Sequence, residues 1–312
     1  MSDVDDHLGG VDDADDAPPP KPPPPDRPLR GIALIVLSTV FLGSADAMGK
    51  YLAAGSLPII EITWLRYATL FVILIGLMMW TGPRAVLRTD QLGYQVLRGV
   101  TLVLSVVLFV WALRFVPLAD AAAIGFSSPL IVTVLSVIIL GEVVGWRRWA
   151  ATIVGFLGVM MVARPGSVTF HPALILAALG AVAWAIGMIL TRKIGGKTSA
   201  ISILAYTCFV GFALLTLLLP FNWITPTPVH VLVGVCAGVS NAIGHWIIVA
   251  AYRQGDASVL APYTYVQLVI STLIGFAVFG EIPAVWSIIG IAVIIGSGIY
   301  SARLLRAPKQ RT

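Results

Sequence analysis

Few residues of this chain could do chemistry, and the most informative are ionisable groups inside long apolar segments. Asp46 and Arg66 each stand about seven residues from the end of such a segment. A helix rises about 1.5 Å per residue, so both side chains would lie roughly 10 Å below the same membrane surface, and an ion pair between them is predicted. Lys50, at i+4 from Asp46, is a competing partner on the same helix face.

The carboxylate of Asp46 has two interpretations. As a functional group, it would carry a proton or contact a charged group of a substrate. As a structural group, it would be the neutralised partner that holds the first two helices together. The substitution Asp46→Asn separates them, because the first interpretation predicts a folded protein without transport and the second predicts loss of the folded protein.

A second polar set lies in the apolar segment 229–252. Asn241 and His245 are four residues apart and therefore share a helix face. His245 could shuttle protons, because an imidazole changes its charge near neutral pH, or it could simply satisfy hydrogen bonds inside the bundle. Gly234 and Gly238 form a G-x-x-x-G pattern, which favours close approach of a neighbouring helix.

Aromatic side chains form the third candidate set, together with polar groups at repeated positions. An offset of 139 residues places Phe126 on Tyr265 and Ser128 on Gln267. With further aromatic residues near mid-membrane these could form an aromatic box for a flat ligand, and ordinary helix packing is the alternative. The aromatic members are Phe126, Tyr263, Tyr265, Trp184 and Trp246.

The elements that must position these residues are ten apolar segments. Hydrophobic residues make up 58% of the chain and charged residues 11%. This is too small a charged fraction to cover the surface of a water-soluble protein. The sequence therefore predicts an all-α polytopic membrane protein with ten transmembrane helices in a lipid bilayer. The expected spans are 31–53, 59–80, 95–114, 118–140, 147–163, 172–191, 199–219, 229–252, 257–280 and 284–304.

The distribution of basic residues predicts the orientation in a bacterial inner membrane. With a cytoplasmic N-terminus, the cytoplasmic segments hold sixteen Lys and Arg, among them Arg98, Arg192, Lys197 and Arg253. The other side holds three, which are Lys50, Arg114 and Arg164. Positive charge is enriched on the cytoplasmic side of membrane proteins, so both termini are expected in the cytoplasm.

An internal repeat gives the domain organisation. Residues 112–142 align without a gap to residues 251–281, which places Arg114 on Arg253 and Gly141-Glu142 on Gly280-Glu281. Each half has five spans, so the halves must be inverted relative to each other, as in many secondary transporters. We expect repeats at 30–166 and 167–305, a disordered Asp/Pro-rich tail at 1–29 and a basic tail at 306–312.

Glu142 and Glu281 each follow a glycine at the end of a span. We expect each to accept hydrogen bonds from exposed amides of the next helix, or to pair with a surface arginine. Both roles are structural.

Several motifs resemble the EamA-type drug/metabolite transporter superfamily over residues 31–305. They are the run Ala112-Leu113-Arg114-Phe115-Val116-Pro117-Leu118-Ala119-Asp120-Ala121, Ser128-Pro129-Leu130, Leu140-Gly141-Glu142, Trp149 and Ala163-Arg164-Pro165-Gly166. The resemblance implies a transporter with a central cavity lined mainly by the first, third, fourth, sixth, eighth and ninth helices.

A finer resemblance suggests the cargo. Asp46-Ala47-Met48-Gly49-Lys50-Tyr51 and Trp64-Leu65-Arg66-Tyr67 resemble a bacterial subgroup that includes riboflavin and S-adenosylmethionine importers. Riboflavin uptake by alternating access is the working hypothesis that this implies. Export of amino acids or drug-like metabolites and uptake of S-adenosylmethionine are the alternatives.

Other classes of function find less support in the sequence. Gly196-Lys197-Thr198 resembles the end of a phosphate-binding loop, but the first glycine of that motif would fall on Thr191. No cofactor, metal site or nucleic-acid partner is expected, and the partners are a small-molecule substrate and the bilayer. An integral membrane enzyme is the alternative of a different class. The sequence does not indicate an oligomeric state.

Overall fold

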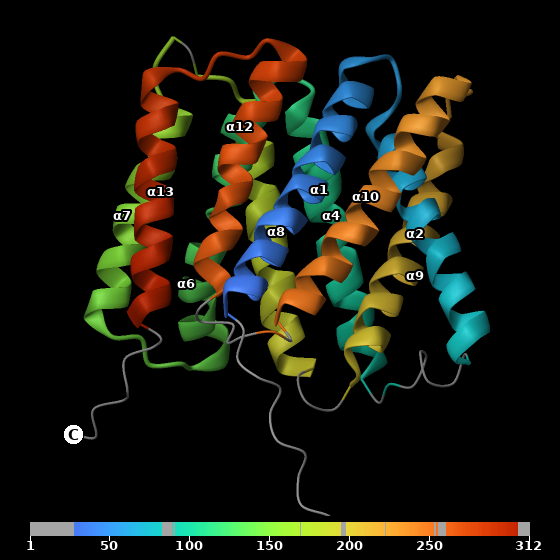
Figure 1. The fold of residues 1–312 in the computed structure, drawn as a ribbon, viewed down its shortest axis with the longest axis horizontal. Helices are drawn as coiled ribbons and strands as arrows, with labels where there is room; N and C mark the ends of the chain where they lie inside the picture. Colours follow the sequence, from blue (N-terminus) through green and yellow to red (C-terminus); the bar gives the residue numbers. More distant parts are fainter. Residues whose placement is uncertain are drawn as a thin grey trace, which may run out of the picture.

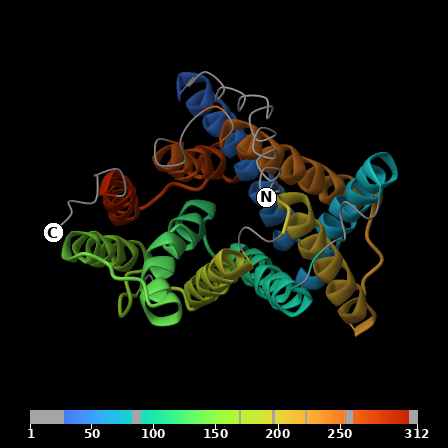
Figure 2. The same ribbon diagram turned by 90° about the horizontal axis from the view of Figure 1, so that it is seen from below.

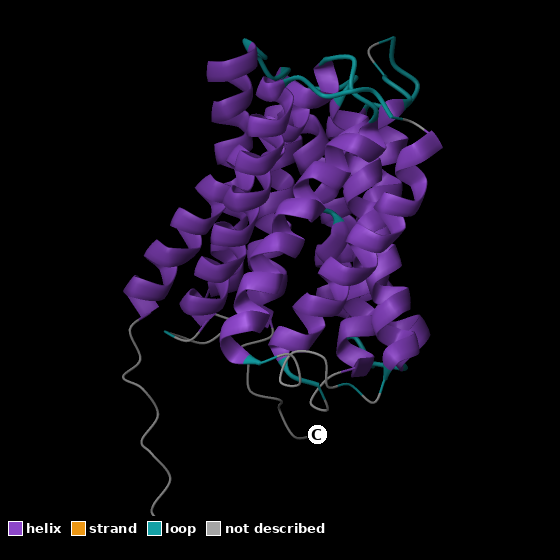
Figure 3. Ribbon diagram, turned by 90° about the vertical axis from the view of Figure 1, so that its right-hand side faces the viewer, coloured by secondary structure: helices purple, strands orange, loops and turns teal. Residues whose placement is uncertain are grey.

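The computed structural model describes residues 28–82, 89, 91–168, 170–194, 198–221, 223–252, 254 and 260–304. Lys197, Arg253, most of the expected 1–29 tail and all of the 306–312 tail lie outside these ranges. Every regular element in the described part of the chain is a helix (Figures 1 and 3). The helices are α1 (Pro28–Ala54), α2 (Ile59–Thr81), α4 (Leu92–Leu113), α5 (Leu118–Gly125), α6 (Ser128–Leu140), α7 (Trp146–Ala163), α8 (Ala173–Ile194), α9 (Ala200–Leu218), η1 (Leu219–Phe221), α10 (Pro228–Tyr252), η2 (Ala261–Tyr265), α12 (Val266–Phe279) and α13 (Val285–Leu304).

These helices account for the ten predicted spans. Eight helical stretches in the described ranges are long and apolar enough to cross a membrane, and Trp149–Ala163 and Val285–Ser301 are two shorter apolar helices. In a bilayer each backbone amide must be satisfied within its own segment, which a helix achieves. The predicted fold class, an all-α bundle of ten membrane helices, is confirmed.

Two of the spans are interrupted at positions that the repeat relates. The fourth span breaks after α5, and Phe126 and Ser127 separate it from α6. The described part of the ninth span opens as the 3₁₀-helix η2, which passes into α12 after Tyr265. Pro129 and Pro262 lie in the first turn of α6 and of η2, where a proline amide, which cannot donate, is tolerated. Broken helices at corresponding places in two halves are typical of transporter binding sites.

Helix packing repeats between the halves. α1 packs against α10 as α8 packs against α4, and α1 meets α12 as α8 meets α6. The last helices of the two halves, α7 and α13, pack on each other (Figure 2). There Gly158 and Gly290 oppose each other, and a Cβ on either would lie within 3 Å of the other's carbonyl oxygen. The structure thus confirms two five-helix repeats of inverted topology.

The bundle has two ends, which differ in the loops that they carry. We call the end at which α1 begins and α13 ends the terminal face, and the other the opposite face (Figure 1). Glu142 follows α6 at the terminal face, and Glu281 follows α12 at the opposite face. A large apolar cluster around α5, with Leu118 and Ile124 fully buried, joins both halves.

Candidate functional site

The predicted pair between Asp46 and Arg66 is present in the structure. Asp46 Oδ1 of α1 lies 3.7 Å from Arg66 Nη1 of α2, and Gln267 Nε2 of α12 donates to Asp46 Oδ2 at 3.2 Å. The side chains of Arg66 and Asp46 are 15% and 14% exposed. At 3.7 Å the pair is a charge contact without a hydrogen bond, so it is weaker than a bidentate arginine–carboxylate pair.

Small residues bring the surrounding helices within reach of this pair. A Cβ on Gly43 of α1 would lie 3.0 Å from Ile270 Cγ2, so the glycine lets α12 come close enough to present Gln267. A Cβ on Gly238 of α10 would lie 3.0 Å from the carbonyl oxygen of Arg66. The predicted close approach at the G-x-x-x-G pattern is therefore confirmed, and the helix that approaches is α2.

The predicted face of α10 continues toward the terminal face beyond the contact with α2. Asn241 is buried, whereas His245, one turn further along, is exposed and lies within electrostatic range of Arg66. Val72 and Ile73 of α2 are also exposed at this depth, and Figure 1 shows α2 and α10 diverging toward the terminal face. This face of α10 thus passes from buried at Asn241 to exposed at His245.

Lys50 does not pair with Asp46, and the competing-partner prediction is wrong. Its ammonium forms an ion pair with Glu281, donates to the carbonyl of Val116 at 2.6 Å and lies over the Phe279 ring. A lysine side chain is long enough to leave its own helix face, and here it reaches the start of α5 and the end of α12. The pair joins α1 of the first half to the end of α12 in the second.

Glu281 also accepts a hydrogen bond from a helix amide, although not from the helix that follows it. Its Oε2 accepts from Leu118 N at 2.9 Å, at the start of α5. A carboxylate is favoured there, because the first amides of a helix are unpaired and its dipole is positive. The expectation of an amide partner is met by a helix from the other half.

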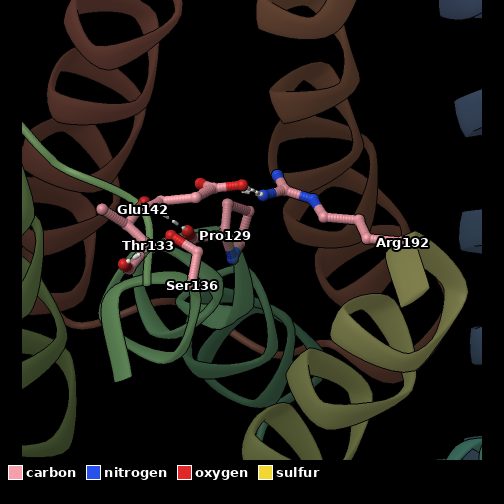
Figure 4. Close-up of polar contacts among 5 residues, drawn as sticks. All are labelled: Pro129, Thr133, Ser136, Glu142 and Arg192. Atoms are coloured by element: carbon pink, nitrogen blue, oxygen red, sulfur yellow. Dashed lines mark hydrogen bonds and ion pairs between the residues drawn. The ribbon is translucent and has the colours of Figure 1, made fainter. Parts of the chain in front are cut away.

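Glu142 occupies the position in the first half that Glu281 occupies in the second. Its carboxylate lies 3.3 Å from Arg192 Nη1, as predicted for a surface arginine, and its amide donates to the carbonyl of Ser136 at 3.2 Å (Figure 4). Glu281 N donates to Gly275 O in the same way. The helices before both residues end at a glycine in the left-handed region, with φ of 67° at Gly141 and 66° at Gly280.

The two ion pairs are therefore related by the repeat. Arg192 lies 142 residues after Lys50 at the end of the first helix of its half, and Glu281 lies 139 residues after Glu142. Their surroundings differ: the side chains of Lys50 and Glu281 are 9% and 21% exposed, whereas those of Arg192 and Glu142 are 45% and 41% exposed.

The predicted aromatic set is only partly brought together. The rings of Phe126 and Tyr265, which the repeat relates, lie 5.6 Å apart at the two helix breaks. Tyr263 and Tyr265 line a cavity of about 310 Å³ between the start of α12 and the end of α13. Trp184 is half-buried in α8, and Trp246 is 74% exposed on the outer side of α10. Neither tryptophan makes a ring contact within the described part of the chain.

The other predicted polar residues lie in the same two breaks. Ser128 is buried at the start of α6, and Gln267 at the start of α12 reaches Asp46. Their repeat-related positions thus share a depth, but only Gln267 joins the ion pair. Substrate contact by any of these residues stays a prediction.

Three buried charged residues were missed as candidates. Glu61, in the first turn of α2, is fully buried, and its Oε2 accepts a hydrogen bond from Ile224 N at 3.1 Å. Arg98, counted above among the cytoplasmic charges, is 6% exposed on α4 and donates to Thr191, Thr207 and the carbonyl of Ile203. Asp120, in the first turn of α5, is buried within electrostatic range of the Lys50–Glu281 pair. Asp120 is the one charged residue in the apolar segment 118–140, which was the signal that could have identified it.

Comparison with known proteins agrees with this architecture. The model of the EamA-like transporter family matches residues 29–164 and 171–302. An S-adenosylmethionine uptake transporter of Rickettsia bellii is 30% identical over 86% of this chain and 92% of its own length. A riboflavin transporter of Vibrio cholerae is 31% identical over 86% of this chain and 91% of its own length.

More distant matches extend the comparison. A pseudopaline exporter of Pseudomonas aeruginosa is 24% identical over 88% of this chain and 96% of its own length. One crystal structure, at 20% identity, has a TM-score of 0.63 and covers 89% of this chain and 99% of its own, which shows the shared fold. The match of the family model to both halves establishes that the chain, a multi-pass membrane protein, belongs to the EamA-like transporter family.

Proposed function

We propose that the chain imports a small metabolite by alternating access. The two repeat-related ion pairs act as closures, which means that each closes the transport path at one face of the bundle. The observation that carries this proposal is their unequal burial. One ionic arrangement, encoded twice, is buried at the opposite face and exposed at the terminal face. In an inverted repeat the two halves exchange conformations, and the opening then moves from one face to the other.

Backbone hydrogen bonds support the ion pair at the opposite face. Lys50 and Glu281 neutralise each other, and each has a further backbone partner near α5, Val116 O for the lysine and Leu118 N for the glutamate. A charged pair is stable in a poorly hydrated place only when such additional hydrogen bonds satisfy it. At the terminal face the Glu142–Arg192 pair is largely hydrated, so it contributes little to closure.

The terminal face is assigned to the cytoplasm by the distribution of Lys and Arg, in the inner membrane of a bacterium. On that assignment the Lys50–Glu281 pair closes this conformation to the outside. Uptake then requires the Lys50–Glu281 pair to separate while the Glu142–Arg192 pair becomes buried. Because one of the similar proteins is a pseudopaline exporter, the direction of transport has to be measured.

Two cargoes are supported by similar proteins, and both contain a flat heteroaromatic ring. The riboflavin transporter of Vibrio cholerae favours riboflavin, and the S-adenosylmethionine transporter of Rickettsia bellii favours a nucleoside-linked amino acid. The Phe126–Tyr265 pair at the helix breaks suits stacking against either ring. Uptake of each labelled compound into proteoliposomes, with the recovered cargo chemically unchanged, tests for transport and separates it from catalysis.

The closures are tested by cross-linking. Lys50 and Glu281 are changed to cysteine in a chain whose Cys208 and Cys236 are replaced, and a short bismaleimide is added. Cross-linking at the opposite face should abolish the uptake that the same double-cysteine protein shows without the reagent. A matched pair at Glu142 and Arg192 is exposed here and should react with the reagent more readily, which gives the corresponding cross-link at the terminal face. Full uptake by the cross-linked protein would overturn the assignment of Lys50 and Glu281 as a closure.

A further inference from the structure

We propose that Asp46 and Arg66 form a clamp for an α-amino-acid group, so that the cargo is a zwitterion attached to a larger body. The inference rests on the proposed function and names its substrate class. The substrate ammonium would bind the Asp46 carboxylate, and the substrate carboxylate would bind the Arg66 guanidinium.

The geometry of the pair carries the inference. Asp46 and Arg66 face each other at 3.7 Å without a hydrogen bond, while the second oxygen of Asp46 is held by Gln267. A pair made only to join α1 to α2 would gain from a closer bidentate contact, which arginine readily makes. Among the described residues only Asp46 pairs with the Arg66 guanidinium, so its donors and one oxygen of Asp46 can bind ligand groups.

Charge balance at the clamp favours a zwitterionic group over a group with a single charge. Inside a membrane an unpaired charge is costly, so Asp46 and Arg66 must stay neutralised in both the empty and the loaded state. In the empty state they neutralise each other. A zwitterion that enters between them keeps each charge paired, whereas a ligand with one charge would leave one residue without a partner.

In the conformation proposed above, in which the opposite face is closed, cargo reaches the clamp from the terminal face. His245, exposed on α10 two turns beyond Gly238, lies within electrostatic range of Arg66. The amide of Gln267 is the neutral group of the site, and it can keep its hydrogen bond to Asp46 while the other oxygen binds an ammonium.

Four probes in proteoliposome uptake test the clamp: S-adenosylmethionine, its decarboxylated analogue, methylthioadenosine and riboflavin. The first carries the complete amino-acid group and a sulfonium outside it. The second keeps the ammonium and the sulfonium but lacks the carboxylate, and the third lacks the sulfonium and both charges of the amino-acid group. We expect uptake of the first only, and at least about tenfold less of the decarboxylated analogue, since a charge-assisted hydrogen bond to Arg66 is lost.

The double variant Asp46→Asn/Arg66→Gln separates binding from a structural role. It removes both charges together, so no unpaired charge is left and folding should be retained, as measured by the thermal midpoint in detergent. If the pair only joins helices, this variant transports as well as the wild type. We expect it to be folded and to lose S-adenosylmethionine uptake at least about tenfold. The single variant Gln267→Ala keeps both charges and removes only the amide of the site, so we expect it to lose less uptake than the double variant.

Three results would overturn the clamp. They are equal or faster uptake of riboflavin or methylthioadenosine, retained S-adenosylmethionine uptake in the folded double variant, and no uptake of any probe by the wild type. In the last case the accessibility of the two faces to thiol reagents still reports on alternating access. Uptake of the four probes therefore tests the clamp, and thiol accessibility of the two faces tests the proposed function separately.

Discussion

The balance between the two conformations can be tested by changing one carboxylate of the ion pair at the opposite face into an amide. Glu281→Gln keeps the size of the side chain and an oxygen that can accept from Leu118 N, but it removes the charge opposite Lys50. Lys50 is then left nearly buried with a carbonyl as its main partner. The conformation closed at this face should lose stability relative to the one that is open there.

The magnitude follows from the burial of the pair. Breaking a fully buried ion pair costs about 3–5 kcal/mol. The side chains here are 9% and 21% exposed, and the hydrogen bond to Leu118 N is kept, so we take about 2–3 kcal/mol. At about 1.4 kcal/mol per factor of ten, the closed-to-open ratio at the opposite face falls roughly 30- to 140-fold.

The assay is alkylation of a cysteine behind the closure by a membrane-impermeant reagent. Ala119 of α5 is 4% exposed in the closed state, so Ala119→Cys, in a chain without Cys208 and Cys236, should react slowly. Its labelling rate follows the open population and should rise with Glu281→Gln by the same factor, until the open state dominates.

The matched control is Glu142→Gln at the terminal face. That pair is 41–45% exposed, so its removal should change labelling of Ala119→Cys by less than about fivefold, and in the direction of slower labelling. Labelling that is unchanged by Glu281→Gln, with an unchanged thermal midpoint, would refute the argument that burial makes this pair the stronger closure.

Three further predictions concern packing and the outer surface. Gly290→Ala should destabilise the α7–α13 contact by about 1–3 kcal/mol, because its Cβ would meet the Gly158 carbonyl. The control is Gly296→Ala on the same helix, whose Cβ would meet nothing within 4 Å and which should be neutral or stabilising. The thermal midpoints of the two variants in detergent are compared. Arg98→Met should lower stability by about 1–3 kcal/mol, because the hydroxyls of Thr191 and Thr207 lose their shared donor; an unchanged denaturation midpoint would contradict this. Trp246→Phe should leave uptake within about twofold of the wild type, since the ring is 74% exposed on the outer side of α10; a large loss of uptake would place it in the substrate path instead.

The parts of the fold that depend on hydropathy and depth could be predicted from the sequence. Span length is set by bilayer thickness, and the depth of Asp46 and Arg66 follows from counting residues along a helix. Their pairing is therefore recovered, as is the inverted packing, because an odd number of spans per repeat leaves no other topology. These are one-dimensional properties that the chain order fixes.

Side-chain direction could not be predicted in the same way. In a membrane bundle the lipid-facing and core-facing sides are both apolar, so hydropathy does not tell which face of α10 carries Trp246 outward. Lys50 was assigned to the wrong partner because four long bonds carry its charge away from its own helix face. Arg98 was counted only as a cytoplasmic charge because it lies near a span end, and sequence did not show that α8 and α9 cover it.

The repeat also explains why one motif can have two environments. Glu142 and Glu281 have the same glycine before them and the same backbone hydrogen bond behind them, so local sequence does not make one pair buried and the other exposed. The difference must come from the arrangement of the halves, which places Leu118 N against Glu281 while Glu142 faces water with Arg192. Because the two local structures are equivalent, exchanging their environments requires movement of helices and not refolding of either loop. That is the condition under which an inverted repeat can move an opening across a membrane at low energetic cost.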